Sequence, residues 1–206
     1  MSIVRSVERP MICSGLLFEI CMAVNREIKT QRGEGGYCIL ASAAARDILE
    51  AKGWEADVMV VEAVVFPDDR SRHAKILGGD GDGTRRPAAK PGCWHGHLAA
   101  IAEDRWLIDP SLDQTGLAPP MVVEFPEWWL AGGRRTIRVP IDGGWVRYRA
   151  YPGRGGYRYK PDFRPSHRRE IVQPVVNQLG PSASKAAMAK SPSSTSPRHD
   201  GVAVSA

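Results

Sequence analysis

The sequence is poor in cysteine, has few aromatic residues and lacks any long apolar run. Its 206 residues include four unevenly spaced cysteines without a C-x-x-C pair, so a disulfide framework is not expected. Charged residues interrupt every apolar stretch before it reaches the ~18 to 20 residues that a membrane span requires. The first residues carry charges at Arg5, Glu8 and Arg9, and no cleavage site typical of a secretory signal follows. We therefore expect a cytoplasmic protein that makes no membrane contact and whose cysteines are free thiols: Cys13, Cys21, Cys38 and Cys93.

Charge is divided unevenly along the chain. The formal net charge is +5, but residues 1–133 hold 14 Lys/Arg against 19 Asp/Glu, whereas residues 134–206 hold 14 against 4. Hydrophobic residues make up 43% of the chain, which is enough for one well-packed core. We expect a single domain over residues 1–152 and a basic extension over 153–180. Residues 181–206, mostly Ser, Ala, Pro and Lys, are expected to form a disordered tail.

Two helices are predicted near the N-terminus. Apolar residues recur every four positions from Ile12 to Ile28, which is typical of an amphipathic helix and brings Cys13 and Cys21 close to its core face. A glycine-containing break follows, and residues 37–53 then predict a second helix that stops at a glycine.

The remaining pattern predicts an antiparallel sheet. Residues 56–66 are rich in valine and predict a buried strand, after which residues 67–93 read as a long loop or lid. Further strands are predicted by short alternating segments: a hairpin over 94–110, then 121–125, 136–141 and 145–151. The expected fold is therefore α+β, with N-terminal helices packed on an antiparallel β-sheet.

Cys38 stands at the start of the second predicted helix, two residues after the Gly35–Gly36 pair. A helix N-terminus offers N–H groups without intrahelical partners and the positive end of the helix dipole, which favour a cysteine in its thiolate form. A thiol nucleophile also needs a base that a third group holds in place.

The predicted hairpin supplies a base and a carboxylate. If its turn is centred on Glu103, His97 lies directly opposite Asp109 and both side chains project to the same face. Asp109 ends an apolar strand, where a carboxylate without a partner would be costly to bury. We therefore expect His97 and Asp109 to be partners.

The run WLIDPS at residues 106–111 follows a cysteine at a helix start and a histidine on the preceding strand. In this order the three features resemble the transglutaminase-like core. This papain-like cysteine fold is shared by transglutaminases, some proteases, peptide N-glycanases and, more distantly, arylamine N-acetyltransferases. The resemblance covers roughly residues 31–115 and implies a catalytic triad of Cys38, His97 and Asp109. Its implied activity is cofactor-free acyl transfer or amide hydrolysis on a protein, peptide or small amide.

Other residues are candidates for supporting roles. Gln31 stands upstream of the cysteine, as the oxyanion-binding glutamine of papain-like enzymes does, and backbone N–H groups at the start of the Cys38 helix are expected to help. Four residues beside the triad positions are candidates for binding substrate: Tyr37, Trp94, His95 and Trp106.

Two alternatives remain open at the level of sequence. Cys93, His95 and His97 form a C-x-H-x-H pattern that can bind Zn²⁺ together with Asp109. Residues 134–169 contain 11 Lys/Arg against two acidic residues and are interleaved with aromatic residues. Such a stretch is either a solvated basic face or the surface of a non-catalytic module that binds a protein or, weakly, a nucleic acid.

Overall fold

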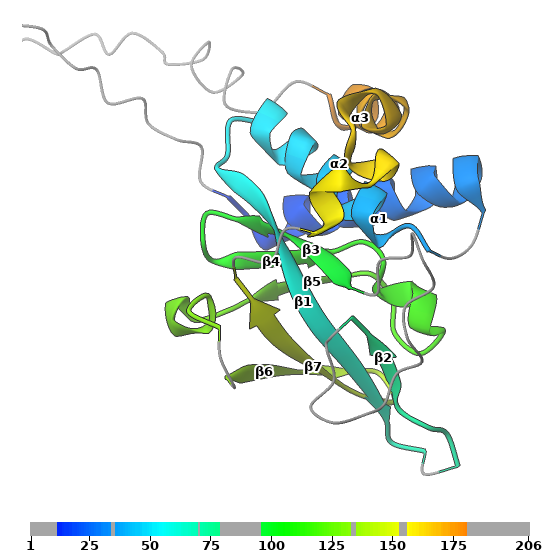
Figure 1. Cartoon of the computed structure of the whole chain (residues 1–206), viewed down its shortest axis with the longest axis vertical. Helices are drawn as coiled ribbons and strands as arrows, with labels where there is room; N and C mark the ends of the chain where they lie inside the picture. The colour runs from blue at the N-terminus through cyan, green and yellow to red at the C-terminus, as the bar shows by residue number, and fades with distance from the viewer. Residues whose placement is uncertain are drawn as a thin grey trace, which may run out of the picture.

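A computed structural model describes residues 12–33, 36–69, 71–78, 96–132, 135–152 and 156–180. Within these ranges the chain forms three α-helices and one seven-stranded antiparallel β-sheet (Figure 1). This arrangement confirms the α+β class. The expected tail, residues 181–206, lies outside the described residues. No helix in these ranges is both long enough and apolar enough to cross a lipid bilayer.

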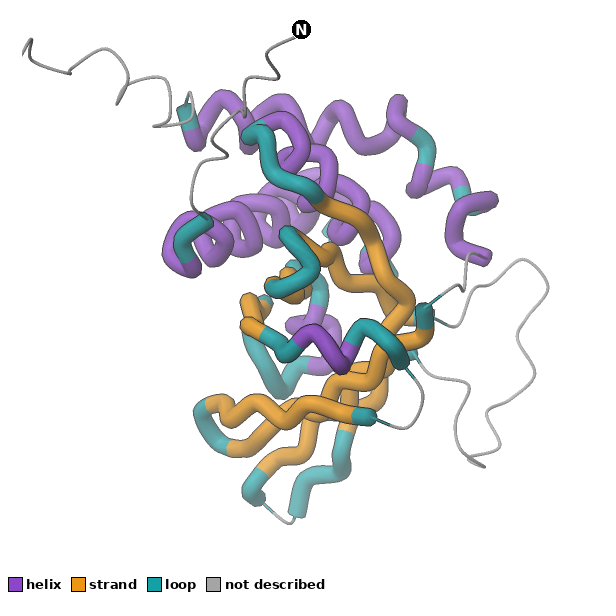
Figure 2. The backbone as a smooth tube through the Cα atoms, turned by 90° about the vertical axis from the view of Figure 1, so that its left-hand side faces the viewer, coloured by secondary structure: helices purple, strands orange, loops and turns teal. Residues whose placement is uncertain are grey.

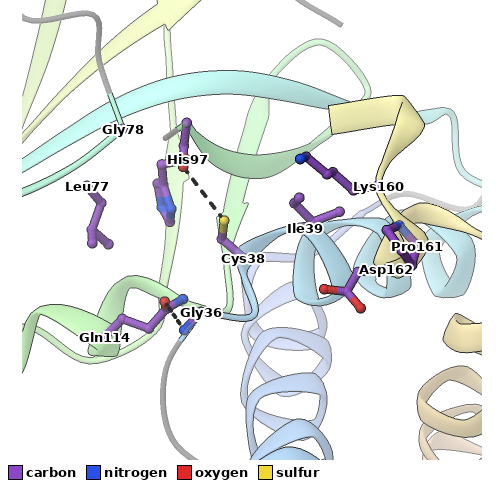
Figure 3. Close-up of a pocket in the computed structure, with 11 residues that line it drawn as sticks. Gly36, Cys38, Ile39, Leu77, Gly78, His97, Gln114, Lys160, Pro161 and Asp162 are labelled. Atoms are coloured by element: carbon purple, nitrogen blue, oxygen red, sulfur yellow. Dashed lines mark hydrogen bonds between the residues drawn. The ribbon is translucent and has the colours of Figure 1, made fainter. Parts of the chain in front are cut away.

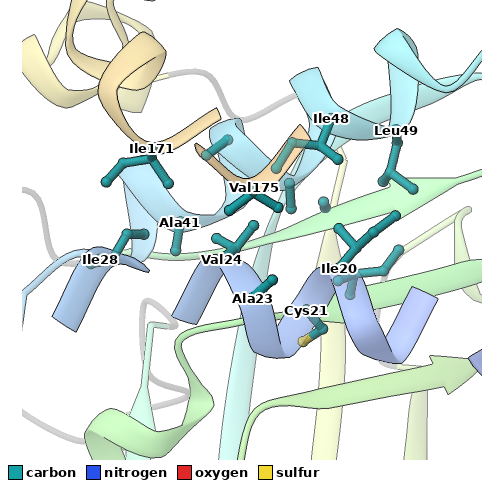
Figure 4. Packing of buried hydrophobic residues seen from close by; sticks show 14 of the residues in the cluster. Ile20, Cys21, Ala23, Val24, Ile28, Ala41, Ile48, Leu49, Ile171 and Val175 are labelled. Carbon is teal, nitrogen blue, oxygen red and sulfur yellow. The ribbon is translucent and has the colours of Figure 1, made fainter. Parts of the chain in front are cut away.

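The helices α1 (Ser14–Arg32) and α2 (Cys38–Ala51) form a layer on one face of the sheet (Figure 1). The four-residue spacing of α1 buries Ile20, Val24 and Ile28 against α2 (Figure 4). At its other end α2 stops as predicted, because Gly53 follows its C-cap with a φ of 88°.

Two of the expected features of α1 need correction. Cys13 is exposed, since it caps the N-terminus of the helix instead of lying on its buried face, whereas Cys21 is fully buried as expected. The helix also continues through Gln31 to Arg32, into residues 31–36, where the glycine-containing break between the two helices was expected.

A third helix, α3 (Pro165–Leu179), corrects the expectation of an extension after residue 152. Ile171 and Val175, one helical turn apart, are buried in the same apolar cluster as α1 and α2 (Figure 4). Arg168 is also buried and forms an ion pair with Asp47 of α2. Residues 156–180 are therefore part of the packed domain.

The sheet has the strand order β5-β4-β3-β1-β7-β6. Because β1 is much longer than β3, part of its edge is left over, and β2 pairs there with Ala63 to Val65. This short strand lies inside the segment 67–93 that was expected to be a loop or lid, of which residues 70 and 79–93 are outside the described part. The strands are β1 (Ala56–Pro67), β2 (Lys75–Leu77), β3 (His97–Ala102), β4 (Trp106–Asp109), β5 (Met121–Glu124), β6 (Thr136–Ile141) and β7 (Gly144–Tyr151).

The sheet is curved (Figure 2), and side-chain alternation gives it two different faces. Ala100, Ala102 and Ile108 face the helices, whereas Ala99 and Leu107 face an inner apolar cluster to which β7 also contributes. Alternation along β7 is complete, with every second residue buried. His97 and Asp109 share the parity of the inner face and lie at the ends of their strands, where that face meets the start of α2.

Short 3-10 helices connect these elements: η1 (Leu112–Thr115), η2 (Glu127–Trp129), η3 (Gly156–Tyr159) and η4 (Pro161–Phe163).

Candidate active site

Cys38 is the first residue of α2 and lies next to the first residue of β3. One turn into the helix, the Ser42 hydroxyl donates a hydrogen bond of 2.7 Å to the carbonyl of Leu98, which fixes α2 against β3. The Cys38 Sγ is 3.9 Å from the carbonyl oxygen of Gly96. The thiol is thereby held beside His97, with which it interacts.

His97 and Asp109 form a buried pair. The His97 Nε2 is 2.8 Å from the Asp109 Oδ2, and neither residue is more than 1% exposed. The contact predicted from the sequence is therefore present. Because Nε2 is engaged by the carboxylate, the other ring nitrogen, Nδ1, is left for the Cys38 side.

The hairpin that carries this pair has a different register from the one expected. β3 and β4 pair Ala102 with Trp106, so the turn is centred on Asp104 instead of Glu103. The shift moves Asp109 two positions along β3, which keeps it on the same face as His97 but makes the two residues diagonal neighbours. Side chains at diagonal positions can still bridge the strands, and this one does.

The Asp109 carboxylate accepts three further hydrogen bonds, from two residues. Its Oδ1 accepts hydrogen bonds from the Ser111 backbone N–H at 3.2 Å and from the Ser111 hydroxyl at 3.3 Å. Its Oδ2 accepts a third from the Tyr148 hydroxyl at 3.1 Å. Tyr148 belongs to β7, two strands beyond β3, and reaches Asp109 because the sheet curves around the inner cluster. These donors satisfy a carboxylate that is fully buried.

The charge of Asp109 determines the state of the imidazole. Burial alone lowers the pKa of His97, but the neighbouring Asp109 carboxylate and its hydrogen bond, with a smaller contribution from Cys38, raise this pKa from 6.5 to about 10. His97 is therefore an imidazolium at neutral pH. A positively charged imidazole beside a cysteine stabilises the thiolate, which is the nucleophilic form.

Two neighbouring groups are kept protonated. Burial, reinforced by the negative charge of Asp109, raises the pKa of Tyr148 well above its ordinary value, so its hydroxyl remains a donor. Burial also raises the pKa of the Cys21 thiol, with Asp109 and Asp113 adding to the effect. Cys21 is therefore an unreactive core thiol.

Cys38 and His97 open into a pocket of about 270 Å³. Figure 3 shows Gln114 and Leu77 on the His97 side of Cys38, and Lys160, Pro161 and Asp162 on the other side. Pro161 and Asp162 belong to η4, so the segment expected to be an extension forms one wall of the site.

Gln31 does not reach this pocket. Its Nε2 donates to the Glu27 Oε1 at 2.7 Å and to the backbone carbonyl of Glu170 at 3.0 Å. Glu170 precedes Pro174 by four residues, and a proline cannot donate the helical hydrogen bond to that carbonyl. Gln31 therefore satisfies an acceptor that Pro174 leaves open in α3, which corrects its expected role at an oxyanion.

The expected substrate-binding residues are also placed elsewhere or lie outside the described ranges. Tyr37 is buried and donates through its hydroxyl to the Asp113 Oδ1 at 3.1 Å, and Trp106 packs against the helix-side cluster. Neither lines the pocket. The remaining candidates, Trp94, His95 and Cys93, are not among the described residues. In the part of the chain that is described, no three His, Cys, Asp or Glu side chains are grouped to hold a metal ion.

Sequence reasoning missed Tyr148, Gly78 and Gln114 as parts of the site. Tyr148 reads as one of the buried positions of an alternating strand, and only the curvature of the sheet brings it to Asp109. Gly78 follows β2 and lines the same pocket as His97. Gln114 lies five residues after Asp109, so a search for amides downstream of WLIDPS could have found it.

The chain matches no protein-family model, and no curated protein or solved structure is significantly similar to it.

Proposed function

We propose that this protein is a cysteine-nucleophile enzyme of the transglutaminase-like, papain-like kind, acting in acyl transfer or amide hydrolysis. The observation that carries the proposal is the buried His97–Asp109 pair, with Nε2 and Oδ2 2.8 Å apart, directly beside Cys38 in a pocket. The start of α2 adds backbone N–H groups without helical partners at the same point. The substrate class that fits this chemistry is a protein, peptide or small amide.

Cys38, His97 and Asp109 each have a separate role in the proposed reaction. The Cys38 thiolate attacks the carbonyl carbon of the acyl donor, and a C–S bond forms while the carbonyl π electrons move to oxygen. As the intermediate collapses, the bond to the leaving group breaks and the His97 imidazolium supplies the proton that this group needs. His97, now neutral, deprotonates the water or amine that releases the acyl group. Asp109 keeps Nε2 occupied, so that Nδ1 faces the reacting atoms.

Acylation of the thiol by an activated ester tests this proposal. With p-nitrophenyl acetate we expect mass spectrometry to locate an acetyl group on Cys38 before any on Cys13, an exposed thiol that serves as the internal reference. His97→Ala should slow acetylation of Cys38 by about 10²-fold or more because the positively charged imidazole that favours the thiolate is lost. Equal acetylation of Cys38 and Cys13 in the unsubstituted protein would contradict the proposal.

A second candidate function, polyanion binding, is favoured by one surface. We name it the arginine–aromatic face: Arg138, Arg147, Trp145 and Phe66. Arg138 and Arg147 are directly opposed on β6 and β7, where two like charges repel. Arg138 lies over the Trp145 ring at 4.8 Å, and Trp145 stacks on Phe66 at 4.0 Å. Arg147 lies over the Phe66 ring at 5.5 Å and pairs with Glu62 at 3.4 Å, so both rings already have partners. A phosphate of the polyanion would therefore pair with Arg138, where it would offset the repulsion from Arg147.

A further inference from the structure

We infer that Gln114 is a catalytic residue that donates its side-chain N–H to the oxyanion formed when Cys38 attacks an acyl carbonyl. The inference rests on the proposed function of Cys38. Gln114 lies in η1, and it takes the oxyanion-binding role that the sequence had indicated for Gln31.

The first observation is an amide nitrogen without a partner. The Gln114 Nε2 is buried, yet no atom of the described residues accepts a hydrogen bond from it. Buried donors in folded proteins are almost always satisfied, so one that is left open at a reactive site calls for a ligand.

The second observation is that the amide has a fixed orientation. The Gln114 Oε1 accepts a hydrogen bond of 2.9 Å from the Gly36 backbone N–H, so the donor end of the amide is the one without a partner. Gln114 lines the same pocket as Cys38 and His97, and Figure 3 shows it across from the sulfur, beneath His97.

The third observation is that η1 is tied to the loop that precedes Cys38. Besides the Gly36–Gln114 bond, the Tyr37 hydroxyl donates to the Asp113 Oδ1, and Lys29 of α1 forms an ion pair with Asp113. The Thr115 hydroxyl closes η1 by donating to the Leu112 carbonyl at 2.9 Å. Nucleophile and amide are therefore held as one rigid unit, as oxyanion stabilisation requires.

The chemistry follows directly. When the C–S bond forms, the carbonyl π electrons become the negative charge on oxygen. The Cys38 backbone N–H, at the first position of α2, supplies one donor, and the Gln114 Nε2 supplies a second. No proton is transferred from the amide, and both donors are released when the carbonyl re-forms.

Two reactions of the same thiol distinguish this role from a structural one. Acetylation by p-nitrophenyl acetate passes through an oxyanion, whereas alkylation by iodoacetamide displaces iodide at a saturated carbon and forms none. We expect Gln114→Ala to slow acetylation of Cys38 by about 10²-fold while its alkylation rate stays at that of the unsubstituted protein. Gln114→Glu keeps the acceptor for Gly36 but replaces the N–H donor with a carboxylate oxygen, and it should slow acetylation as much. Gln31→Ala is the matched control and should leave both rates unchanged.

Each outcome has a single reading. Unchanged acetylation in Gln114→Ala overturns this inference while leaving the proposed function standing. Loss of acetylation and alkylation together overturns it in favour of a structural role for Gln114. If the unsubstituted protein acetylates Cys38 no faster than Cys13, the proposed function fails, and the inference fails with it.

Discussion

His97 carries a positive charge inside the protein because Asp109 lies 2.8 Å away, and this has a consequence for stability. Its pKa of about 10 in the folded protein exceeds the ordinary value of 6.5, so the folded state holds one more proton between these limits. The stabilisation is complete below pH 6.5 and is lost as the pH rises toward 10.

We therefore expect the free energy of unfolding to fall between pH 7 and 9 by up to about 1.4 kcal/mol per pH unit. Urea denaturation at a series of pH values measures this slope. Below about pH 8 the raised pKa values of Cys21 and Tyr148 add little, since both groups are then largely protonated in either state; nearer pH 9 the unfolded Cys21 thiol begins to ionise and adds to the slope with the same sign. His97→Gln should flatten the slope, whereas His167→Gln, which removes a half-exposed histidine, should not. A native slope that His97→Gln leaves unchanged would show that His97 is not charged.

Among single residues, those with a strong chemical pattern were the ones that could be predicted. The contact of His97 with Asp109 followed from alternation and from the cost of burying a lone carboxylate, and it survived an error in the turn because the error kept the parity. Cys13 and Gln31 were misplaced because their roles depend on the point where α1 begins and on Pro174 in a distant helix. A local pattern contains neither fact.

At the scale of elements, the end of β2 lies against the start of β3, and this close approach constrains the position of His97. Gly78, directly after β2, has a φ of 72°, and a Cβ there would lie 2.4 Å from the Val61 carbonyl oxygen and 2.7 Å from the His97 Cβ. Any side chain at this position must displace the start of β3.

Gly78→Ala is expected to slow both acetylation and alkylation of Cys38, because His97 moves away from the sulfur. It should also destabilise the protein by about 2 kcal/mol or more. Gly116→Ala is a matched control: its φ of 65° is similar, but no atom lies within 4 Å of the added Cβ. It should lose only about 1 kcal/mol and keep both rates. Alkylation kinetics and urea midpoints measure the two effects, and equal behaviour of the two variants would refute the positioning role.

The predictability of the elements followed their periodicity. Strands β1, β5, β6 and β7 came out within a residue or so of their expected bounds, because valine-rich or alternating runs with clear breakers define them. Helix α3 was missed because it buries few large apolar side chains and contains Pro174. Its stability comes from packing on α1 and α2, and from the Gln31 amide that binds the carbonyl opposite the proline.

At the scale of the whole molecule, the basic half of the chain is not separate from the acidic half. It contributes β6, β7, η4 and α3 to the same domain, and η4 lines the pocket of Cys38. The proposed thiol site and the arginine–aromatic face are therefore parts of one domain.

If the arginine–aromatic face binds single-stranded nucleic acid, the affinity should be weak, independent of sequence and steeply dependent on salt. Each phosphate contact contributes about 0.7 to the slope of log K against log salt, so Arg138→Ala should reduce the slope by about that amount. Fluorescence anisotropy with a labelled oligonucleotide measures it. Arg105→Ala, which removes an arginine paired with Glu124, is the control, and Cys38→Ala should bind as the unsubstituted protein does. Sequence-selective binding whose affinity does not change with salt concentration would contradict nucleic-acid binding by the arginine–aromatic face.

The hydrogen bond from Tyr148 to Asp109 also bears on the order in which the site is assembled during protein synthesis. The two residues are 39 positions apart, and Tyr148 reaches the site only after β7 has paired with β1. A ribosome that has released the chain as far as β4 has already delivered Cys38, His97 and Asp109, but neither the tyrosine that completes the carboxylate network nor the helix that covers α1 and α2. Contacts between such distant segments form late in folding. The growing chain therefore carries Cys38 through synthesis before the hydrogen bonds around Asp109 are complete, and the proposed site is finished only after β7 has been released and has paired with β1.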